Sequence, residues 1–491
     1  MSFTSPGFFL FFLVYFVASL FLSRERWLLF AALASSFFYA FWDWRFLFLL
    51  YYVVTISWFV GEKLYSEHSE SVRRRYVVLS VVSCLSVLAV FKYFDFFVDS
   101  FTRMTASFGL QLQPRFAQVL LPIGISFYTF HALSYTIDLY RRKLAAPASY
   151  LTLVVYLAFF PQLVAGPIVR ATRFLPQIER GPVFSPRKLK SALLIIAWGY
   201  FLKVCVADSI APLVDPIFAA PGNFESGALL FAIAAYSFQI YCDFAGYSLI
   251  AIGLAKTQGF DFPANFLAPY FSRSFSEFWR RWHISLSSFL RDYLYIPLGG
   301  NRHGRLREDR NIMVTMFLGG LWHGASYNFV VWGVLHGIYL LLQRWWKLLL
   351  QALGFAPRRP RAPARLASPR APSRWASSRW AIAALQIAGV YALVCLAWVF
   401  FRLHRFHDAL LFLQGIWHLQ ALGVIFNKFQ SLKVLVLIGL TLAVDLVFIR
   451  RRNMVRILRS RYAYALAIAL LLVTIEMFGS FGGGAFIYFQ F

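Results

Sequence analysis

Two short segments place histidines beside tryptophan in apolar sequence, and these histidines are the first candidates for chemistry. His283 lies in "SEFWRRWHISLSS", while His323 and His336 lie in "LWHGASYNFVVWGVLHG" at 321–337. A neutral imidazole can act as a general base, and desolvation favours its neutral form. Such a base could take the proton from an acceptor hydroxyl as that hydroxyl attacks an acyl thioester.

The second segment predicts different roles for its two histidines. If 321–337 forms one helix, His336 lies about 220° around and about 20 Å along the axis from His323, so the two cannot share a small site. His336 would then lie on a stripe with Trp322 and Phe329, typical of aromatic packing or a tunnel lining. Small residues permit the close approach of a helix or a ligand. Three of them flank His323: Gly319, Gly320 and Gly324.

The region 262–310 is too charged to span a membrane, and it is predicted to be re-entrant or interfacial. Glu277 and Arg281 would form an i,i+4 pair on one helix face, and "PLGGN" would end the helix. His283 lies beside the opposite, aromatic face. Its side chain either points toward protein, or it is an interfacial histidine with no functional role. That face has helical spacing: Phe275, Phe278, Trp279 and Trp282.

Two apolar segments carry polar stripes at helical spacing. Gln239, Asp243 and Tyr247 recur at i, i+4 and i+8. An intramembrane carboxylate is costly unless it is partnered, so Asp243 is a candidate site residue. The second stripe has 3,4,3 spacing: Tyr128, His131, Tyr135 and Asp138. Both stripes are candidate tunnel walls, or else they only hold a helix bundle together through hydrogen bonds.

Composition predicts an all-α integral membrane protein. The 491 residues are 60% hydrophobic and 14% charged, whereas globular domains have about 45–50% apolar and about 25% charged residues. A helix needs about 20 apolar residues to cross a bilayer, which predicts about eleven to thirteen spans in one domain, 1–491. The spans are expected at 7–22, 27–43, 46–61, 77–91, 117–136, 150–168, 190–209, 226–255, 311–346 (broken), 381–401, 432–449 and 463–478.

The net charge of +27 comes mostly from basic loops. With 19% aromatic residues and continuous apolar spans, these loops indicate membrane lipid rather than nucleic acid as the partner. Three basic clusters, 62–75, 344–379 and 450–461, are expected in the cytoplasm, which places both ends of the chain outside. The stretch 356–379 has seven Arg and five Pro and is predicted to be a flexible loop that touches lipid heads or docks an acidic protein.

The four cysteines are scattered through apolar sequence: Cys84, Cys205, Cys242 and Cys395. They form no CxxC pair and have no histidine at ligand spacing, so neither a disulfide framework nor a metal site is expected. The sequence also lacks the GxSxG, P-loop, GxGxxG and HExxH patterns. These absences remove several familiar classes of enzyme.

With these residues assembled, the chain resembles the membrane-bound O-acyltransferase family, and within it the bacterial alginate O-acetylase branch. The resemblance covers most of the chain and rests on five blocks in the same order as in that branch. They are "LPIGISFYTFHALSYTIDLYR" (121–141), "FFPQLVAGPIVR" (159–170), "SFSEFWRRWHISLSSFLRDYLYIPLGGN" (274–301), "GGLWHGASYNFVVWGVLHG" (319–337) and "FIYFQF" (486–491).

The resemblance implies a ring of helices around a central tunnel in the cell inner membrane. His323 would be the catalytic histidine and His283 the second essential position. An acyl thioester such as acetyl-CoA, or a carrier loaded from it, would donate from the cytosol, with no tightly bound cofactor. The acceptor would be an extracellular polysaccharide such as alginate, reached with the help of a periplasmic O-acetyltransferase partner.

Two features leave the acceptor open. "SYNF" at 326–329 stands where the alginate branch is expected to have "WTF", and the 356–379 insert has no known family counterpart. Alternatives with the same chemistry are the transfer of D-alanine, a lipid acyl group or another acyl group to a cell-wall polymer such as teichoic acid, or to a protein hydroxyl. A membrane transporter whose polar stripes line a substrate path is the alternative of a different class.

Overall fold

The computed structural model describes residues 1–110, 120–164, 166–354, 376–418, 428–448, 459–481 and 486–487. Those residues form helices and connecting segments, with no β-strand among them. The predicted all-α class is therefore confirmed. The predicted flexible loop at 356–379 lies outside the described residues except for its last four, where a helix begins.

The chain folds into two compact units. Unit 1 comprises Met1–Leu213, Phe238–Asn265 and Phe426–Phe491, and unit 2 comprises Val214–Ser237 and Phe266–Ile425. Two helices contribute residues to both units: α10 (Asp208–Ala219) and α11 (Ser226–Thr257). The two polar stripes thus belong to unit 1, and the three candidate histidines belong to unit 2.

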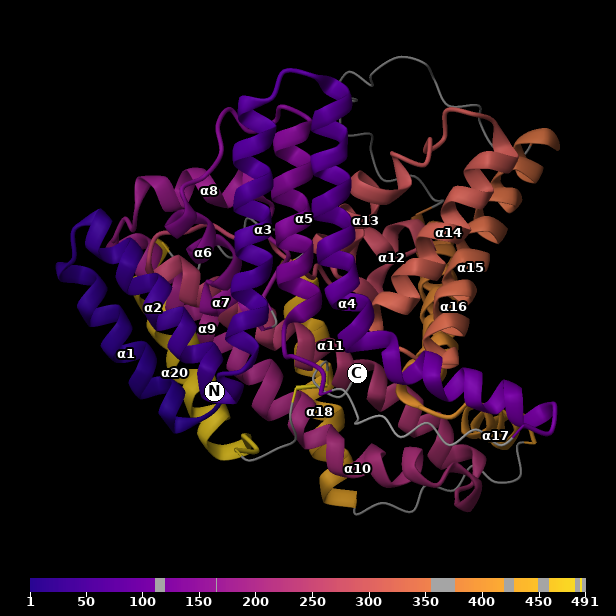
Figure 1. Ribbon diagram of the computed structural model, residues 1–491. Helices are drawn as coiled ribbons and strands as arrows, with labels where there is room; N and C mark the ends of the chain where they lie inside the picture. The colour runs from indigo at the N-terminus through magenta and orange to yellow at the C-terminus, as the bar shows by residue number, and fades with distance from the viewer. Residues whose placement is uncertain are drawn as a thin grey trace. The chain divides into compact units, whose positions relative to one another are not determined.

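Unit 1 gathers helices from both ends of the chain. In Figure 1, α3, α4 and α5 lie side by side. Its helices are α1 (Pro6–Phe21), α2 (Arg24–Asp43), α3 (Phe46–Ser66), α4 (Glu70–Ser107), α5 (Ile125–Tyr140), α6 (Tyr150–Ala158), α7 (Phe160–Leu163), α8 (Ala171–Arg180), α9 (Pro186–Tyr200), the π-helix η1 (Phe201–Ala207), α18 (Lys428–Phe448) and α20 (Arg461–Phe478).

Unit 2 combines short helices with a long helical hairpin. In Figure 1, α14, α15 and α16 lie side by side. Its elements are the 3₁₀ turns η2 (Pro221–Asn223) and η3 (Pro269–Phe271), α12 (Phe275–Arg281), α13 (Ile284–Leu290), the π-helix η4 (Arg291–Tyr295), α14 (Arg305–His323), α15 (Tyr327–Ala352), α16 (Ala376–Arg402) and α17 (Phe406–Trp417).

Six of the described helices are long and apolar enough to cross a membrane: Phe46–Ser66, Glu70–Ser107, Pro186–Ala219, Ser226–Thr257, Trp380–Arg402 and Arg461–Phe478. The break predicted within 311–346 is confirmed, because α14 ends at His323 and α15 begins at Tyr327. The condition of one helix through 321–337, on which the separation of His323 from His336 was predicted, is therefore not met. Gly324 leaves the helix in an extended conformation, and Ser326 then starts α15 by accepting the N–H of Phe329.

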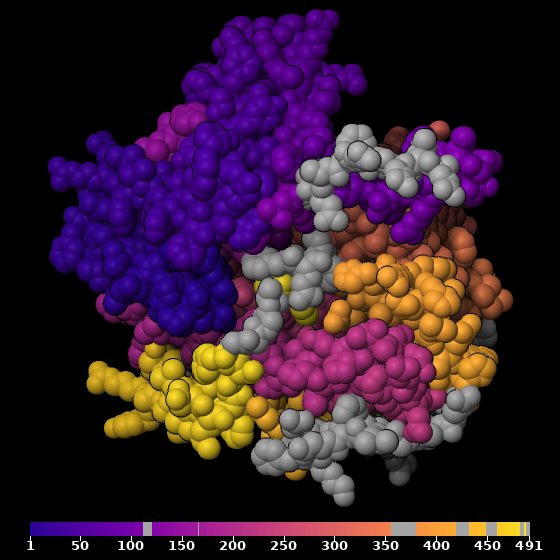
Figure 2. All heavy atoms as spheres, turned by 60° about the horizontal axis from the view of Figure 1, so that its bottom comes forward, coloured from indigo at the N-terminus to yellow at the C-terminus, as the bar shows by residue number. Residues whose placement is uncertain are grey.

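Helix α20 shows how far the apolar surface departs from that of a soluble protein. None of its residues is buried, although its exposed side chains include Leu466, Leu470 and Val473. The yellow spheres of this helix lie open on the surface in Figure 2. A continuous apolar helix surface of this kind requires an apolar surrounding, which the hydrocarbon of a bilayer provides.

Candidate functional site

A break between two short helices holds His283. Ser274 caps α12 by accepting the N–H of Glu277 at 3.2 Å, and the predicted ion pair of Glu277 with Arg281 is present at 2.7 Å. His283 follows with φ 42° and ψ 56°, a left-handed conformation that non-glycine residues seldom adopt, and its side chain is buried. Surrounding structure must over-determine such a residue. The fold therefore gives His283 a defined place.

The prediction of one helix running to "PLGGN" is wrong. The chain instead forms α12, α13 and the π-helix η4 before that turn. Helical periodicity could not show the break, because Trp282 and His283 continue the pattern of the aromatic face. The left-handed residue turns the chain between Arg281 and Ile284 and ends that pattern early.

His323 is the last residue of α14, and glycines bring α14 and α15 into close contact beside it. A Cβ on Gly320 would clash with the carbonyl oxygen of Phe329, and a Cβ on Gly324 would clash with its ring. A Cβ on Gly333 would clash with the backbone of Met316. The glycines that flank His323 therefore serve helix packing, one of the two uses that the sequence left open.

Trp322 brings His283 and His323 together. Its ring centroid lies 5.9 Å from that of His283 and 4.9 Å from that of His323. Both contacts are edge-to-face, an arrangement that fixes the orientation of one ring against the next. Two histidines 40 residues apart in the sequence thus share one indole neighbour.

Further aromatic rings enclose His323. Its ring centroid lies 4.9 Å from that of Trp332 and 5.1 Å from that of Phe401. On the side of His283, Nδ1 lies 3.5 Å from the hydroxyl of Ser285. His323 is 3% exposed and His283 is fully buried. The two imidazoles therefore lie in an aromatic environment that limits contact with water.

His336 lies in the same aromatic cluster, and Trp332 links it to His323. Its ring centroid lies 4.7 Å from that of Trp332, and it stacks on Phe278 at 6.0 Å and 6°. The separation of about 20 Å from His323 predicted by a single helix is wrong, because α15 turns back along α14. Within the described residues, neither ring nitrogen of His336 has a hydrogen-bond partner. Trp279 contacts His336 at 5.0 Å, so both residues pack here.

Three members of this cluster were missed from the sequence. Trp332 contacts both His323 and His336, while Trp398 and Phe401 of α16 add a fourth helix to the cluster, after α12, α14 and α15. The available signal was the position of Trp332 nine residues after His323. The "AWVFF" run of α16 gave no such signal, because aromatic residues are common throughout this chain.

In unit 1, Asp243 is held by a buried ion cluster. One carboxylate oxygen lies 2.7 Å from Nζ of Lys203, and the other accepts the backbone N–H of Ile487 at 2.8 Å. Lys203 also pairs with Asp208 at 2.8 Å. Phe486 packs on Tyr247 with ring centroids 4.3 Å apart. The Asp243 stripe therefore anchors the segment 486–487.

Lys203 was missed from the sequence, although a lone lysine in the predicted span 190–209 is itself a signal. Of the other stripe residues, Tyr247 bonds Ser2 at 3.1 Å between side-chain oxygens. Gln239 is buried, and its Oε1 has no hydrogen-bond partner among the described residues. Lys203 also lies over the ring of Tyr247 at 5.5 Å.

The α5 stripe bonds to neighbouring segments of unit 1. Nε2 of His131 accepts the N–H of Val169 at 3.1 Å, and the hydroxyl of Tyr135 accepts the N–H of Ala148 at 3.2 Å. Asp138 pairs with Lys143 at 3.5 Å, and Tyr128 is fully buried. Hydrogen bonds to loop backbone are what the bundle-holding alternative predicts for this stripe.

The histidine cluster has the parts that general-base catalysis requires. An imidazole can accept a hydroxyl proton, and ring packing presents it in one geometry. In the described part of the chain, no group of three or more His, Cys, Asp or Glu residues is arranged to hold a metal ion. The arrangement suits acyl transfer to an alcohol, in which one positioned base activates the attacking oxygen.

The fold and this cluster define a multi-pass membrane enzyme. Residues 115–370 match the membrane-bound O-acyltransferase family, MBOAT, and the chain belongs to that family. The match includes His283 and His323. The expectation that the chain is an O-acyltransferase is thereby confirmed.

Among individual proteins, the chain is 38% identical over 431 residues to the probable alginate O-acetylase AlgI of Pseudomonas aeruginosa, covering 86% of this chain and 77% of that protein. It is 33% identical over 441 residues to the peptidoglycan O-acetyltransferase of Helicobacter pylori, covering 84% and 78%. The teichoic acid D-alanyltransferase of Streptococcus thermophilus is 28% identical over 267 residues, covering 51% and 64%. The resemblance to the alginate O-acetylase branch is confirmed.

Proposed function

We propose that this enzyme works in the cell inner membrane and passes acetyl groups from a cytosolic acyl thioester across the membrane for O-acetylation of an extracytoplasmic polysaccharide. The similarity to alginate O-acetylases supports the acetyl group and the polysaccharide. The donor is acetyl-CoA or a carrier loaded from it, and a periplasmic O-acetyltransferase completes delivery. The observation that carries the proposal is the contact of both His283 and His323 with Trp322 inside the family match.

In the proposed reaction, His323 takes the proton of an acceptor hydroxyl as the oxygen attacks the thioester carbonyl. A C–O bond forms and the C–S bond breaks, which releases the thiolate. The proton held by the imidazole then goes to the thiolate, so the products are an ester and a free thiol. His283 acts across Trp322 as the positioning partner. A general base of this kind contributes about 10²–10⁴-fold to the rate.

A second candidate is the transfer of another acyl group, such as D-alanine, to a cell-wall polymer or a protein hydroxyl. The similarity to the teichoic acid D-alanyltransferase favours this acyl group, and the similarity to the peptidoglycan O-acetyltransferase favours only a cell-wall polymer as the acceptor. The transporter alternative has no such support, because the family is one of acyltransferases. The two acyl candidates differ in the acid that mild base releases from the product.

The test is the ester content of secreted and cell-wall polymers from cells that carry wild type, His323→Ala or His283→Ala. The control is His68→Ala, a change to an exposed histidine in the turn between α3 and α4. We expect acetate from wild-type and control polymer and a loss of ester in both site variants, with equal amounts of protein in the membrane. Release of alanine would establish the second candidate. Unchanged ester in both site variants would overturn the proposed mechanism.

A further inference from the structure

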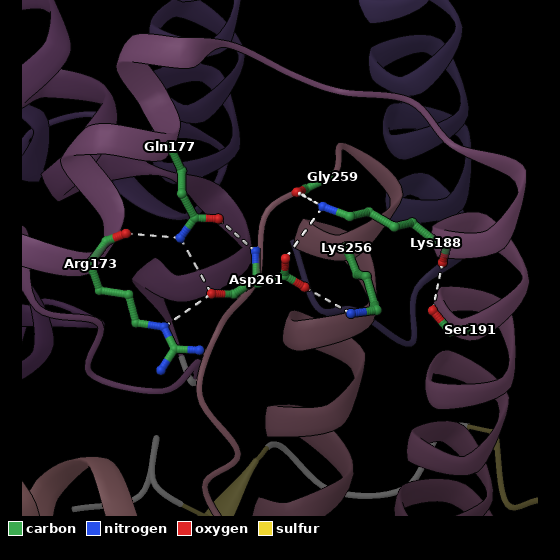
Figure 3. A network of polar contacts seen from close by, with 7 residues as sticks. All are labelled: Arg173, Gln177, Lys188, Ser191, Lys256, Gly259 and Asp261. Atoms are coloured by element: carbon green, nitrogen blue, oxygen red, sulfur yellow. Dashed lines mark hydrogen bonds and ion pairs between the residues drawn. The ribbon is translucent and has the colours of Figure 1, made fainter. Parts of the chain in front are cut away.

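A polar network at one end of unit 1 fixes three basic side chains around Asp261 (Figure 3). The Asp261 carboxylate lies 2.8 Å from Nζ of Lys256 and 3.3 Å from Nζ of Lys188. Its main-chain oxygen accepts the Nε–H of Arg173 at 3.2 Å, and its N–H donates to Gln177 at 2.7 Å. The network joins α8, the start of α9 and the segment that follows α11.

The start of α2 lies against the same end of unit 1. An ideal Cβ on Gly181 would lie 3.2 Å from the side chain of Arg24, and the rings of Trp27 and Phe260 contact each other at 5.4 Å. The segments 23–27, 171–191 and 256–261 therefore form one surface, here called the basic rim. They contain eight basic and three acidic residues, a net charge of +5.

The charge of the network is well defined at neutral pH. Partial burial alone would raise the pKa of Asp261, but Lys256 and Lys188 outweigh burial and hold the pKa below its ordinary value. The carboxylate is therefore ionised, and it balances only one of the three cations bound around it. The basic rim keeps an excess of positive charge in a fixed arrangement.

The cations lie where membrane-crossing helices end. Arg187, Lys188 and Lys190 are among the first five residues of the span Pro186–Ala219, and Lys256 is next to the last residue of the span Ser226–Thr257. Lys188 and Lys256 share Asp261, so these two helix ends meet at one membrane surface. Basic residues at this level face lipid headgroups.

Exposed apolar side chains adjoin these cations. Phe21 precedes Arg24 and is 82% exposed, while Leu29 and Leu193 are exposed within about one turn of Arg26 and Lys190. These exposed apolar side chains would contribute nothing to the binding of a soluble acidic partner. A phospholipid has both complementary parts, an anionic phosphate for the cations and acyl chains for the apolar side chains.

Arg173 is placed to bind a phosphate oxygen. Its Nε–H is used by Asp261, and Figure 3 shows the two terminal nitrogens of its guanidinium directed away from the network. A guanidinium held in this way presents its remaining N–H groups in a fixed fork, the geometry that suits phosphate. The network therefore orients Arg173 in advance.

We propose that the basic rim binds the phosphate of an anionic phospholipid, with Arg173 and Arg187 as contacts and with the lipid's acyl chains along the exposed apolar side chains of α2 and α9. The lipid is retained as a structural ligand of unit 1. This site is independent of the acyl-transfer histidines, which belong to unit 2.

Native mass spectrometry of the full-length protein in detergent, titrated with phosphatidylglycerol or phosphatidylcholine, tests the proposal. Wild type should retain phosphatidylglycerol preferentially. Arg173→Gln/Arg187→Gln should lower that affinity roughly 20–30-fold, because two cations near a headgroup are lost. The matched control is Arg74→Gln/Arg75→Gln, which removes two exposed charges from the start of α4 and should change the affinity by less than about twofold.

Three outcomes would overturn the proposal: no preference for phosphatidylglycerol in wild type, equal losses in the rim and control variants, or displacement of the lipid by coenzyme A or inorganic phosphate. The last outcome would assign the rim to a soluble phosphate ligand. If the double variant does not fold, Arg187→Gln alone takes its place, with an expected loss of about fivefold. Arg187 is exposed and lies outside the Asp261 network.

Discussion

The ion cluster of unit 1 and the histidine cluster of unit 2 are both buried and polar, yet they are held in different ways. In unit 1, Lys203 is shared by Asp208 and Asp243, and Asp243 also accepts a backbone N–H from Ile487. Buried charges are costly to desolvate and are tolerated only with partners of opposite charge. Each charge therefore fixes other parts of the chain.

In unit 2, aromatic rings rather than ion pairs hold the buried histidines in place. The rings of Trp322, Trp332 and Phe401 surround His323, and the rings of Phe278 and Trp332 contact His336. Neutral imidazoles can be buried without a counter-ion, and ring contacts orient them without ion pairing. Paired buried ions therefore indicate a structural role, whereas imidazoles held by rings remain able to accept a proton.

Replacing His323 and His336, one at a time, by phenylalanine distinguishes a role in the reaction from a role in packing. The His323 replacement has the largest expected effect. His323→Phe should lower acyl-transfer activity about 10²–10⁴-fold, because a phenyl ring packs but accepts no proton. His336→Phe is the matched control and should keep activity within about threefold, since no hydrogen bond of His336 is lost among the described residues. Transfer rates with a labelled acyl donor measure both. Equal losses would show that His336 also takes part in the reaction.

Lys203→Met tests whether the ion cluster is architecture. Removal of the lysine leaves Asp208 and Asp243 buried without their cation, which should cost about 3–5 kcal/mol of stability. Thermal unfolding in detergent measures the loss. Lys203→Met/Asp208→Asn/Asp243→Asn removes all three charges and should recover part of it. A triple variant no more stable than Lys203→Met would contradict the pairing account.

The sequence predicted what depends on composition and local spacing. Apolar stretches gave the helical membrane class and the break within 311–346, and i,i+4 spacing gave the Glu277–Arg281 pair. Helical spacing also gave the polar stripe of Gln239, Asp243 and Tyr247 within an apolar segment. Each of these depends on residues close in sequence, which a periodic pattern reports directly.

What the sequence could not show depends on contacts between distant segments. Lys203 meets Asp243 across 40 residues, and α16 brings Trp398 and Phe401 to the histidines. The left-handed backbone of His283 is equally invisible, since its side chain continues the aromatic pattern of α12. "SYNF" illustrates the difference: it looked like a departure in the acceptor site, yet Ser326 caps α15 and Asn328 donates to Leu403.

Asn328→Ala should therefore weaken the packing of α16 against the histidine cluster. The Asn328 side chain donates to the carbonyl oxygen of Leu403, two residues after Phe401, and so ties the start of α15 to the end of α16. Loss of this buried hydrogen bond should cost about 1–3 kcal/mol and lower activity less than His323→Phe does. The control is Asn223→Ala, an exposed asparagine of unit 2. An unchanged melting temperature for Asn328→Ala would contradict the tie.

The Asp261 network is an ion network exposed to solvent, in contrast to the buried ion cluster around Lys203. Its loss has the smallest expected effect. The Asp261 side chain is 50% exposed, and exposed pairs contribute about 0–1 kcal/mol. Lys256 and Lys188 outweigh partial burial and lower its pKa in the folded protein. Its contribution is therefore complete above the unfolded pKa of about 3.9 and is lost as the pH falls through the lower folded value.

Melting temperatures of wild type and Asp261→Asn across acid pH check this sign. The difference should stay constant from about pH 8 to about pH 5 and shrink only below about pH 4, because the wild-type carboxylate is protonated only there. High salt should reduce the same difference, whereas the effect of Lys203→Met should persist, since salt screens exposed pairs far more than buried ones. If the difference for Asp261→Asn persists at high salt, the Asp261 network is shielded from solvent like the buried ion cluster, which would contradict its assignment as an exposed network.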